Sequence, residues 1–370
     1  MKTRKEHGPS IKNKTRKIHA TVWPTKSIVY ICGQTRLKFG PSDKDLGGSE
    51  QAVVQLSKCW ADKGYKVVVY GNVKECNKDG VEYKDIHKLN LGDTFHFAIF
   101  WRSFGIRLLP IVKAKFKIVD LHDSWDPKNY VSPTELVDQT SLFMVKSNYH
   151  KELYPYIPSS KMRIVMNGVQ VDLFKTMIDK VEATGQQRDP LKFIYASTYE
   201  RGLEPILRYT WPIIKSKVPD ATIDIYYGMN RLADTPLGKK LVELFKQDGV
   251  KEHGRVDLDV IAKQKALSGF HLYISNSETE IDCISVRESL LCGAIPILGN
   301  DYVFKERDGI HVTGSTKNMS TYRRAGATVV SLIKRGEPFL EKKRQEFAKS
   351  KTIISWEEVA QKWINAFESL

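Results

Sequence analysis

Two glutamates separated by seven residues are the feature of the sequence that most strongly suggests chemistry. Glu280 follows an expected strand, and Glu288 falls in the opening turns of the next expected helix. Between them, the backbone N–H groups of residues 283–285 would point out of the helix N-terminus, a position that suits a phosphate group. Glu288 could then hold a diol, such as a ribose, with its two carboxylate oxygens. The alternative is that one acid lies in an exposed loop and the other on a helix surface, where both contact only the helix dipole.

The elements that position this pair alternate between strands and helices along most of the chain. Short β-branched and aromatic runs indicate buried parallel strands, which we expect at 27–32, 66–70, 97–101, 117–121, 142–146, 193–196, 222–227, 272–275 and 295–298. The helical spacing of apolar residues predicts helices at 50–63, 204–217 and 286–292. This alternation predicts an α/β fold with two doubly wound parallel sheets.

A polar, weakly periodic segment at 176–190 predicts a linker between two domains. We expect the first domain at residues 27–175 and the second at 191–354, because each is long enough to bury its own core. Such folds bind ligands in the cleft at the carboxyl ends of their strands. Residues 355–370 form an expected amphipathic helix with Trp356, Trp363 and Phe367 on one face and a capping box at its start.

The composition is that of an ordinary globular protein, with 41% apolar and 27% charged residues, which excludes a chain that is disordered throughout. No stretch approaches the ~18 consecutive apolar residues of a membrane span. The five cysteines include no C-x-x-C pair, which favours a reducing compartment over a disulfide framework or a zinc site.

The net charge of +15 is concentrated near the N-terminus. Residues 1–26 contain eight basic residues and one acidic residue, a net charge of +7. We expect this tail to be a solvated, disordered arm; the alternatives are contact with an anionic membrane surface or, less favoured, with nucleic acid. Because the tail has no apolar segment, we expect no secretory signal and a cytoplasmic protein that is at most peripheral on a membrane surface.

Together with the sequence S-L-L-C-G-A-I-P-I that follows it, the glutamate pair resembles the signature of family 4 retaining glycosyltransferases, which have the GT-B fold. Four further segments are similar to segments of that family and occur in its order: G-G-S-E at 47–50, residues 147–174, Y-A-S-T-Y-E-R-G-L-E at 195–204 and S-W-E-E-V-A-Q-K-W at 355–363. The resemblance implies two Rossmann-like domains, the first binding an acceptor and the second a nucleoside diphosphate sugar. It also implies that the terminal helix packs back onto the first domain.

The resemblance implies three catalytic residues. Glu280 would position the hydroxyl groups of the donor sugar as positive charge builds at the anomeric carbon. Arg201 would stabilise the departing diphosphate. His122, in the sequence L-H-D after an expected strand, would face the transferred sugar, although a single histidine can equally be structural. No metal ion is expected, because Arg201 and helix N-termini would take its place.

The resemblance also implies a set of donor-binding residues. Glu288 would bind the ribose, and the glycines at 47 and 48 would let the backbone approach the diphosphate. The full set is Gly47, Gly48, Arg201, Arg255, Val256, Asp282, Cys283, Ile284, Ser285 and Glu288.

The sequence departs from the family pattern at two places. The phosphate-binding turn usually contains two basic residues, but Ser197 lies near the earlier position and only Arg201 remains, so Arg255 could compensate. The residues after the first glutamate are usually Pro-Phe-Gly, but here they are Ile-Asp-Cys at 281–283. An acid near a diphosphate is unexpected, and we therefore expect Asp282 to bind a hydroxyl group of the donor sugar or of the acceptor.

We therefore expect a retaining, metal-independent glycosyltransferase without a cofactor. It would transfer a sugar from a UDP- or GDP-sugar to a glycan, lipid-linked or protein-linked hydroxyl. The alternatives are a nucleotide-sugar epimerase of the same architecture and a catalytically inactive sugar- or nucleic-acid-binding module. Asp257 and Asp259 have the D-x-D spacing of a metal site, but they precede a helix for which Asp259 would serve as the N-cap. The absence of G-x-x-x-x-G-K-[ST] argues against ATP hydrolysis by a P-loop.

Overall fold

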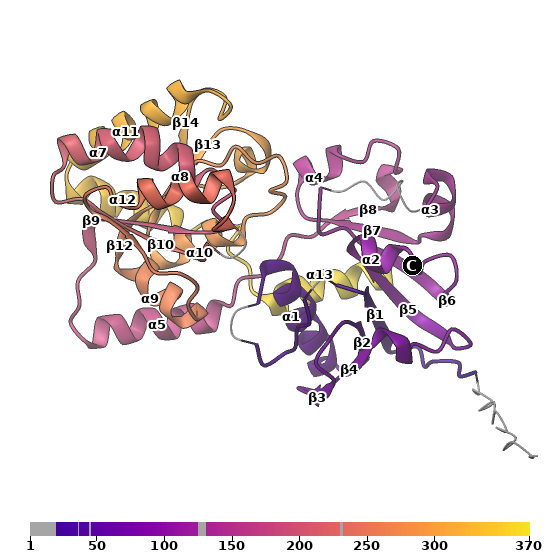
Figure 1. The fold of residues 1–370 in the computed structure, drawn as a ribbon. Coiled ribbons are helices and arrows are strands. Elements are labelled where there is room, and N and C mark those ends of the chain that lie inside the picture. Colours follow the sequence, from indigo (N-terminus) through magenta and orange to yellow (C-terminus); the bar gives the residue numbers. More distant parts are fainter. Residues whose placement is uncertain (1–19, 36, 44–45, 125–130, 230–231) are drawn as a thin grey trace, which may run out of the picture.

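The computed structural model describes residues 20–35, 37–43, 46–124, 131–229 and 232–370. These residues form two α/β units that lie side by side, as Figure 1 shows, and each unit is built on a mainly parallel sheet. The expected α/β class with two doubly wound sheets is confirmed. Within the described ranges, none of the helices has the length and apolar character needed to cross a membrane.

The first unit contains an eight-stranded sheet in the order β3-β4-β2-β1-β5-β6-β7-β8. Its strands are β1 (Ser27–Gly33), β2 (Lys66–Gly71), β3 (Cys76–Lys78), β4 (Val81–Asp85), β5 (Thr94–Trp101), β6 (Lys113–Asp120), β7 (Leu142–Val145) and β8 (Met162–Ile164). Neighbouring strands are parallel except for β3 and β4. Strand order reverses at β1, which lies between β2 and β5, and ligands of doubly wound sheets bind at such a reversal.

Two apolar layers cover the first sheet, because alternate residues of a strand face opposite sides. In β1, Ile28 and Tyr30 belong to one cluster and Val29 and Ile31 to the other. The first cluster is closed by α1 (Gly48–Asp62). The remaining helical elements of this unit are α2 (Arg102–Ile106), α3 (Pro133–Gln139), α4 (Asn148–Glu152) and the 3-10 turns η1 (Ile86–Lys88) and η3 (Ser159–Lys161).

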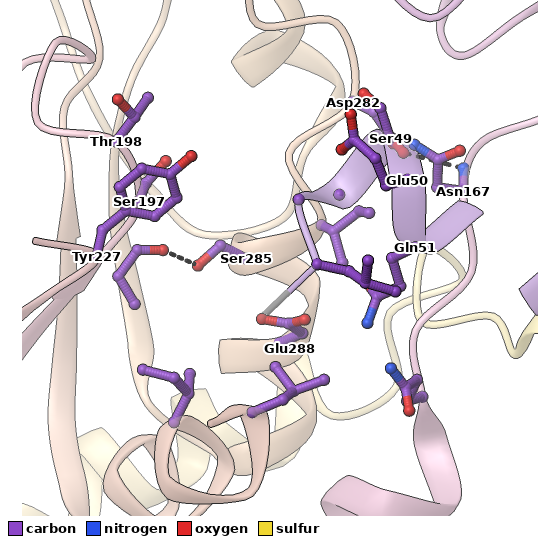
Figure 2. Close-up of a pocket in the computed structure, with 18 of the residues that line it drawn as sticks. Ser49, Glu50, Gln51, Asn167, Ser197, Thr198, Tyr227, Asp282, Ser285 and Glu288 are labelled. Atoms are coloured by element: carbon purple, nitrogen blue, oxygen red, sulfur yellow. Dashed lines mark hydrogen bonds between the residues drawn. The ribbon is translucent and has the colours of Figure 1, made fainter. Parts of the chain in front are cut away.

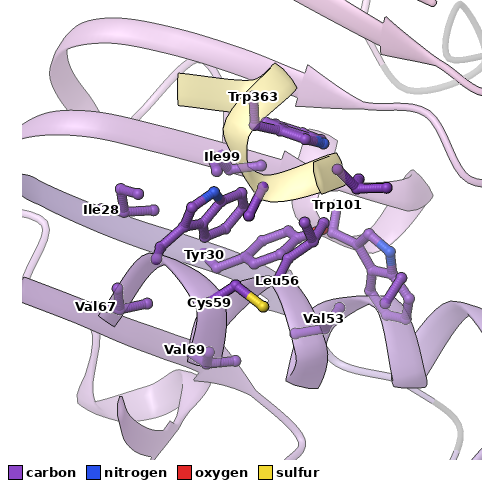
Figure 3. Close-up of a cluster of buried hydrophobic side chains, with 14 of the residues drawn as sticks. Ile28, Tyr30, Val53, Leu56, Cys59, Val67, Val69, Ile99, Trp101 and Trp363 are labelled. Atoms are coloured by element: carbon purple, nitrogen blue, oxygen red, sulfur yellow. The ribbon is translucent and has the colours of Figure 1, made fainter. Parts of the chain in front are cut away.

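The last helix of the chain, α13 (Trp356–Glu368), completes the core of the first unit. The ring of Trp60 in α1 lies 5.4 Å from the ring of Trp363 and 6.0 Å from that of Phe367, measured between centroids. Figure 3 shows Trp363 among side chains of the first sheet and α1. A capping box begins the helix, because the Ser355 hydroxyl accepts from the backbone of Glu358 and the Glu358 side chain accepts from the backbone of Ser355.

The second unit contains a six-stranded parallel sheet in the order β11-β10-β9-β12-β13-β14. Its strands are β9 (Asp189–Ala196), β10 (Thr222–Tyr226), β11 (Val250–Glu252), β12 (Ser268–Tyr273), β13 (Ile295–Gly299) and β14 (Ile310–Val312). Its helical elements are α6 (Leu203–Pro205), the π-helical turn η4 (Ile206–Thr210), α7 (Trp211–Lys217), α8 (Pro236–Leu244), α9 (Leu258–Leu267), α10 (Ile284–Cys292), the 3-10 turn η6 (Tyr302–Glu306), α11 (Met319–Lys334) and α12 (Glu337–Phe347).

Most of the segment expected as a linker, 176–190, is not a loop. The helix α5 (Val171–Ala183) covers its first half, and β9 begins at Asp189. Phe174 and Val181 of α5 pack in one cluster with alanines of α9. The apolar residues that repeat with helical spacing in α5 begin at Val171. The segment expected as a linker starts at residue 176 and therefore contains only part of that pattern. This helix therefore packs on the second unit.

The chain crosses between the units at two neighbouring places. Val169, just before α5, pairs in parallel with Ser355, just before α13, and the Val169 N–H donates to the carbonyl of Ile354 at 2.8 Å. The two crossings are thus hydrogen-bonded to each other. Any movement of one unit relative to the other must therefore bend or shift this pair of segments.

Ordered packing begins earlier than Ser27, the residue at which we expected it. Trp23 is 9% exposed, its Nε1 donates to Asp93 at 3.1 Å and its ring lies 4.8 Å from that of Phe95. Val22 forms a bridge with Thr94. The end of the tail is therefore part of the first unit, whereas residues 1–19 lie outside the described residues.

Candidate functional site

The two units enclose a cavity of about 770 Å³, and every site residue expected from the sequence lines it. These residues are Gly47, Gly48 and His122 from the first unit and Arg201, Arg255, Val256, Glu280, Asp282, Cys283, Ile284, Ser285 and Glu288 from the second. Figure 2 shows the same space with Ser49, Glu50 and Gln51 on one side, Ser197, Thr198 and Tyr227 on the other, and Ser285 and Glu288 between them.

The glycine loop that begins α1 meets α10 across this cavity. Gly47 is the N-cap of α1, and Gly48 is its first residue. A Cβ atom at Gly48 would lie 3.5 Å from Cδ1 of Ile284, the first residue of α10. The N-termini of both helices therefore border the same space. Since a helix N-terminus carries partial positive charge and N–H groups, this space suits an anion such as a phosphate.

Cys283, the N-cap of α10, has a strained backbone. Its φ of +61° lies in the left-handed region that residues other than glycine rarely adopt. Its N–H donates to Oε1 of Glu280 at 3.0 Å. This N–H is therefore used within the loop, and the expected phosphate contact falls to the first turn that Ile284 begins. Burial raises the pKa of the Cys283 thiol far above its usual range, so the thiol stays protonated.

Glu280 is held at the cavity wall by both of its oxygens. While Oε1 accepts from Cys283, Oε2 accepts from Nη1 of Arg201 and from the Tyr273 hydroxyl at 3.2 Å. The charge of Glu280 raises the pKa of Arg201, so the guanidinium stays charged. The Arg201 side chain is nevertheless 31% exposed. A carboxylate that can accept sugar hydroxyls and a cation that can face an anion thus lie side by side.

The turn that carries Arg201 is set by the glycine that follows it. Gly202 has a φ of +98°, and a Cβ atom there would lie 2.4 Å from the carbonyl oxygen of Ile274. Ser197, near the position of the missing basic residue, lies with its Oγ 2.9 Å from the Tyr273 hydroxyl. This turn therefore has one basic side chain, that of Arg201, and supports Glu280 through Tyr273.

Arg255 lies over an aromatic ring. Its guanidinium carbon is 5.0 Å from the ring centroid of Tyr227, and both residues line the cavity together with Val256. A guanidinium stacked on an aromatic face offers a flat surface that suits a planar group such as a nucleobase. The expected compensation by Arg255 for the second basic residue of the turn stays a prediction.

Glu288 is bound to a lysine that the sequence analysis missed. Its Oε2 accepts from Nζ of Lys265 at 2.7 Å. Lys265, in α9, is fully buried and also donates to the carbonyl oxygen of Ser285 at 2.7 Å and to its hydroxyl at 2.9 Å. These three contacts fix the Glu288 carboxylate beside the first turn of α10. The sequence could have indicated this lysine, because its helical spacing with Ala262 and Ala266 places Lys265 on a buried face of the helix.

His122 lies beside a buried charge pair that the sequence analysis also missed. His122 is 5% exposed, and its Nε2 is 3.3 Å from Oδ2 of Asp120. Lys146 donates to Oδ1 of Asp120 at 2.7 Å, and the hydroxyl of Tyr30 donates to Oδ2. Burial lowers the pKa of His122, although Asp120 opposes this effect. The positions of the two residues in the sequence could have indicated this pair, because Asp120 ends β6 and Lys146 directly follows β7.

Asp282 lines the cavity, but its carboxylate is bound within the protein. Oδ2 accepts from Nη2 of Arg287 at 2.7 Å and from the N–H of Asn167 at 2.9 Å, and Oδ1 accepts from Nη2 of Arg307 at 3.0 Å. Burial alone would raise the pKa of Asp282, but the two arginines lower it. These contacts give Asp282 a structural role, and its expected contact with a hydroxyl group of the donor sugar or of the acceptor stays a prediction. They anchor the loop after Glu280 to the crossing between the units.

The D-x-D segment begins a helix, as expected, but with a different cap. Asp257 is the N-cap of α9, and Asp259 lies in its first turn. Both residues line the cavity. In the part of the chain that the structure describes, no group of three or more His, Cys, Asp or Glu side chains is placed to hold a metal ion.

Comparisons with known proteins find no match by sequence, either to a family model or to a curated protein. Solved structures do match by fold. HepE from Anabaena in complex with UDP-glucose is similar with a TM-score of 0.67 and 12% identity, over 93% of this chain and 100% of HepE. Sucrose-phosphate synthase from Thermosynechococcus elongatus is similar with a TM-score of 0.68 and 12% identity, over 93% of this chain and 98% of the synthase. A glycosyltransferase from Rickettsia africae is similar with a TM-score of 0.68 and 13% identity, over 93% of this chain and 98% of that enzyme.

These similarities extend over both units, and at such low identities they bear on the fold. Two Rossmann-like units around a cleft are the architecture that the sequence resemblance implied. The chain has the GT-B fold.

Proposed function

We propose that this protein is a retaining glycosyltransferase that moves a sugar from a nucleoside diphosphate sugar to an acceptor hydroxyl without a metal ion. The observation that carries the proposal is the convergence on one cavity of two helix N-termini, the Arg201–Glu280 pair and the Glu288 carboxylate held by Lys265. HepE, which has the same fold, binds UDP-glucose in its crystal structure. This similarity supports a UDP-sugar over a GDP-sugar as the donor.

The donor can be arranged along the cavity by the chemistry of each wall. The base would stack at Arg255 and Tyr227, and the ribose hydroxyls would donate to Glu288. The diphosphate would lie between the N-termini of α1 and α10, with Arg201 nearby, and the sugar would reach Glu280. In this arrangement each charged or polar part of the donor meets a complementary group.

In the proposed reaction, the bond between the anomeric carbon and the diphosphate oxygen breaks, and a bond from that carbon to the acceptor oxygen forms on the same face of the sugar. The proton of the acceptor hydroxyl passes to the departing diphosphate oxygen. Arg201 and the helix N-termini stabilise the negative charge that grows on the diphosphate. Glu280 holds the sugar hydroxyls as positive charge builds at the anomeric carbon.

The acceptor would enter from the first unit, on the side of Gly47, Gly48 and His122. We propose a glycan, lipid-linked or protein-linked hydroxyl as the acceptor. The basic residues of the tail would bring the protein to an anionic membrane surface that carries such acceptors. Residues 1–19 of that tail lie outside the described residues.

The test is a panel of UDP- and GDP-sugars, measured first by thermal stabilisation and then by product analysis. A true donor at ~100 times its dissociation constant stabilises the fold by ~2.7 kcal/mol. Transfer to an added acceptor with the donor's anomeric configuration, unchanged in EDTA, is the expected result. Conversion of the nucleotide sugar to its epimer without an acceptor would instead identify an epimerase. Binding without any turnover would identify a binding module, and loss of transfer in EDTA that manganese restores would overturn metal independence.

A further inference from the structure

The charge pair beside His122 carries an inference about how that histidine works. Asp120 and Lys146 are 0% and 1% exposed, and neither lines the cavity. Two opposite charges at this depth are retained only when they satisfy each other and their hydrogen-bonding groups. Here Lys146 and Tyr30 both donate to Asp120, so both oxygens of the carboxylate have hydrogen-bond partners other than His122.

We propose that Asp120 and Lys146 are positioning residues that hold His122 at the cavity wall as a neutral imidazole. His122 then acts as an uncharged hydrogen-bonding group toward the substrate and not as a general base. In a histidine–aspartate dyad, the carboxylate stabilises the protonated imidazole and so makes it a good base. In this protein, the ammonium of Lys146 already neutralises that carboxylate.

The charges around His122 support a neutral ring. Asp120 and Lys146 sum to zero, so protonation of His122 would leave an unbalanced positive charge in a buried cluster. Arg102 adds to this effect, because its charge also lowers the pKa of His122. Burial lowers the pKa of the neighbouring His150 to about 3, so that ring is neutral as well.

The other charged side chains near the cluster pair with one another, since Arg102 lies 2.5 Å from Asp123 and 3.6 Å from Glu50. Burial raises the pKa of Tyr30 and of Cys32 well above their usual values, so neither contributes a negative charge at neutral pH. The ring of Trp101, 6.1 Å from that of His122, is apolar. Asp120 is the carboxylate whose charge raises the pKa of His122, and Lys146 is paired with it.

The geometry also selects the tautomer. Nε2 lies 3.3 Å from the Asp120 carboxylate without a hydrogen bond to it, and a carboxylate this near favours the tautomer that carries its proton on Nε2. The other nitrogen, Nδ1, is then a hydrogen-bond acceptor. A substrate hydroxyl that donates to it would be oriented without being deprotonated. This use of His122 rests on the proposed function, whereas its charge state does not.

The experiment measures the pKa of His122 directly, by NMR of the histidine ring signals between pH 5 and 8. Comparison with a His122→Gln variant assigns the signal among the nine histidines of the chain. In the wild type, His122 should stay neutral across this range. In Lys146→Met its pKa should rise into the range, because Asp120 is released to stabilise the imidazolium. Lys146→Arg, the matched control, keeps the charge and should leave His122 neutral.

Two outcomes would overturn the inference: a wild-type His122 that titrates near pH 6.5, or a folded Lys146→Met whose His122 does not shift. If Lys146→Met does not fold, Asp120→Asn decides, because it should leave the pKa of His122 low, and a rise would contradict the proposal. The pH dependence of transfer gives a second readout. Lys146→Met should lose activity as the pH falls through the raised pKa, whereas the wild type should not. If His122 is neutral but the protein uses no nucleotide sugar, the proposed function is wrong and the inference about the charge state of His122 still holds.

Discussion

Nζ of Lys265 lies 2.7 Å from Oε2 of Glu288, with the lysine side chain fully buried. The same ammonium binds the carbonyl and hydroxyl oxygens of Ser285, so one buried cation ties the carboxylate to the first turn of α10. A carboxylate fixed in this way can hold two neighbouring hydroxyl groups in one orientation. The proposed ribose site therefore depends on a residue outside the glutamate motif.

The first prediction concerns the ribose contact. Glu288→Gln should weaken the binding of a nucleoside diphosphate by ~1.5–3 kcal/mol, the range for a hydrogen bond to a charged group. Titration calorimetry measures the loss. A 2′,3′-dideoxy analogue serves as the control ligand, since it has no ribose hydroxyls and should bind the wild type and the variant equally. An equal loss for both ligands would show that Glu288 does not bind the ribose.

The second prediction concerns Arg201, which the charge of Glu280 keeps charged at the cavity wall. Arg201→Ala should lower kcat by about 10²–10³ and change donor affinity much less, because charge on the diphosphate grows in the transition state. Arg201→Lys, which retains the charge, should recover part of the rate. Steady-state kinetics with a saturating acceptor separate the two parameters. A kcat within twofold of the wild type in Arg201→Ala would assign the charge to another residue.

The third prediction concerns the terminal helix. Trp363 is fully buried against Trp60, so Trp363→Ala should destabilise the protein by ~3–5 kcal/mol, as is usual for removal of a buried aromatic side chain. Lys362→Ala, at an exposed position of the same helix, is the matched control and should change stability little. Denaturant unfolding measures both. Equal stability of the two variants would contradict the role of α13 in the core.

The fourth prediction separates the two parts of the basic tail. Deletion of residues 1–19 should leave the melting temperature unchanged and should weaken binding to anionic vesicles by ~1 kcal/mol for each basic residue near the surface. Deletion of residues 1–26 also removes Trp23 and its contacts with Asp93 and Phe95, and should lower the melting temperature. Trp23→Ala in the full chain should reproduce that destabilisation. Two deletions of equal stability would show that Trp23 contributes nothing to the fold.

The fifth prediction concerns pH. Burial lowers the pKa of His150 to about 3, whereas an unfolded histidine titrates near ~6.5. As the pH falls below ~6.5, the unfolded state takes up a proton that the native state does not, so stability falls by up to ~1.4 kcal/mol per pH unit. Between pH 7 and 5, the wild type should lose ~2 kcal/mol more than His150→Gln. An equal loss in both proteins would show that His150 is not the group responsible.

Much of the fold follows from local sequence. Strands such as 27–32 and 193–196 are short β-branched and aromatic runs because both of their faces are buried, and the structure places β1 and β9 there. The ends of such strands also located the cavity, since ligands of this architecture gather at the carboxyl edge of a parallel sheet.

The charged partners of the site could not be found in the same way. Lys265 acts on Glu288 from another helix, and Arg307 acts on Asp282 from a position 25 residues later. Each pair forms only once the strands between them are in register. A motif identifies the residue that touches a ligand, whereas the residues that orient it are set by tertiary packing.

The position of α13 has a consequence for the order of folding during synthesis. The core around Trp60 needs Trp363 and Phe367, yet about 190 residues of the second unit are made between Val169 and Trp356. At 5–20 residues per second, this interval lasts roughly 10–40 s. Throughout that time, the nascent first unit presents an apolar groove beside α1, because Trp363 and Phe367, which fill it, have not yet been made. The core of the first unit therefore closes only after the second unit has been synthesised.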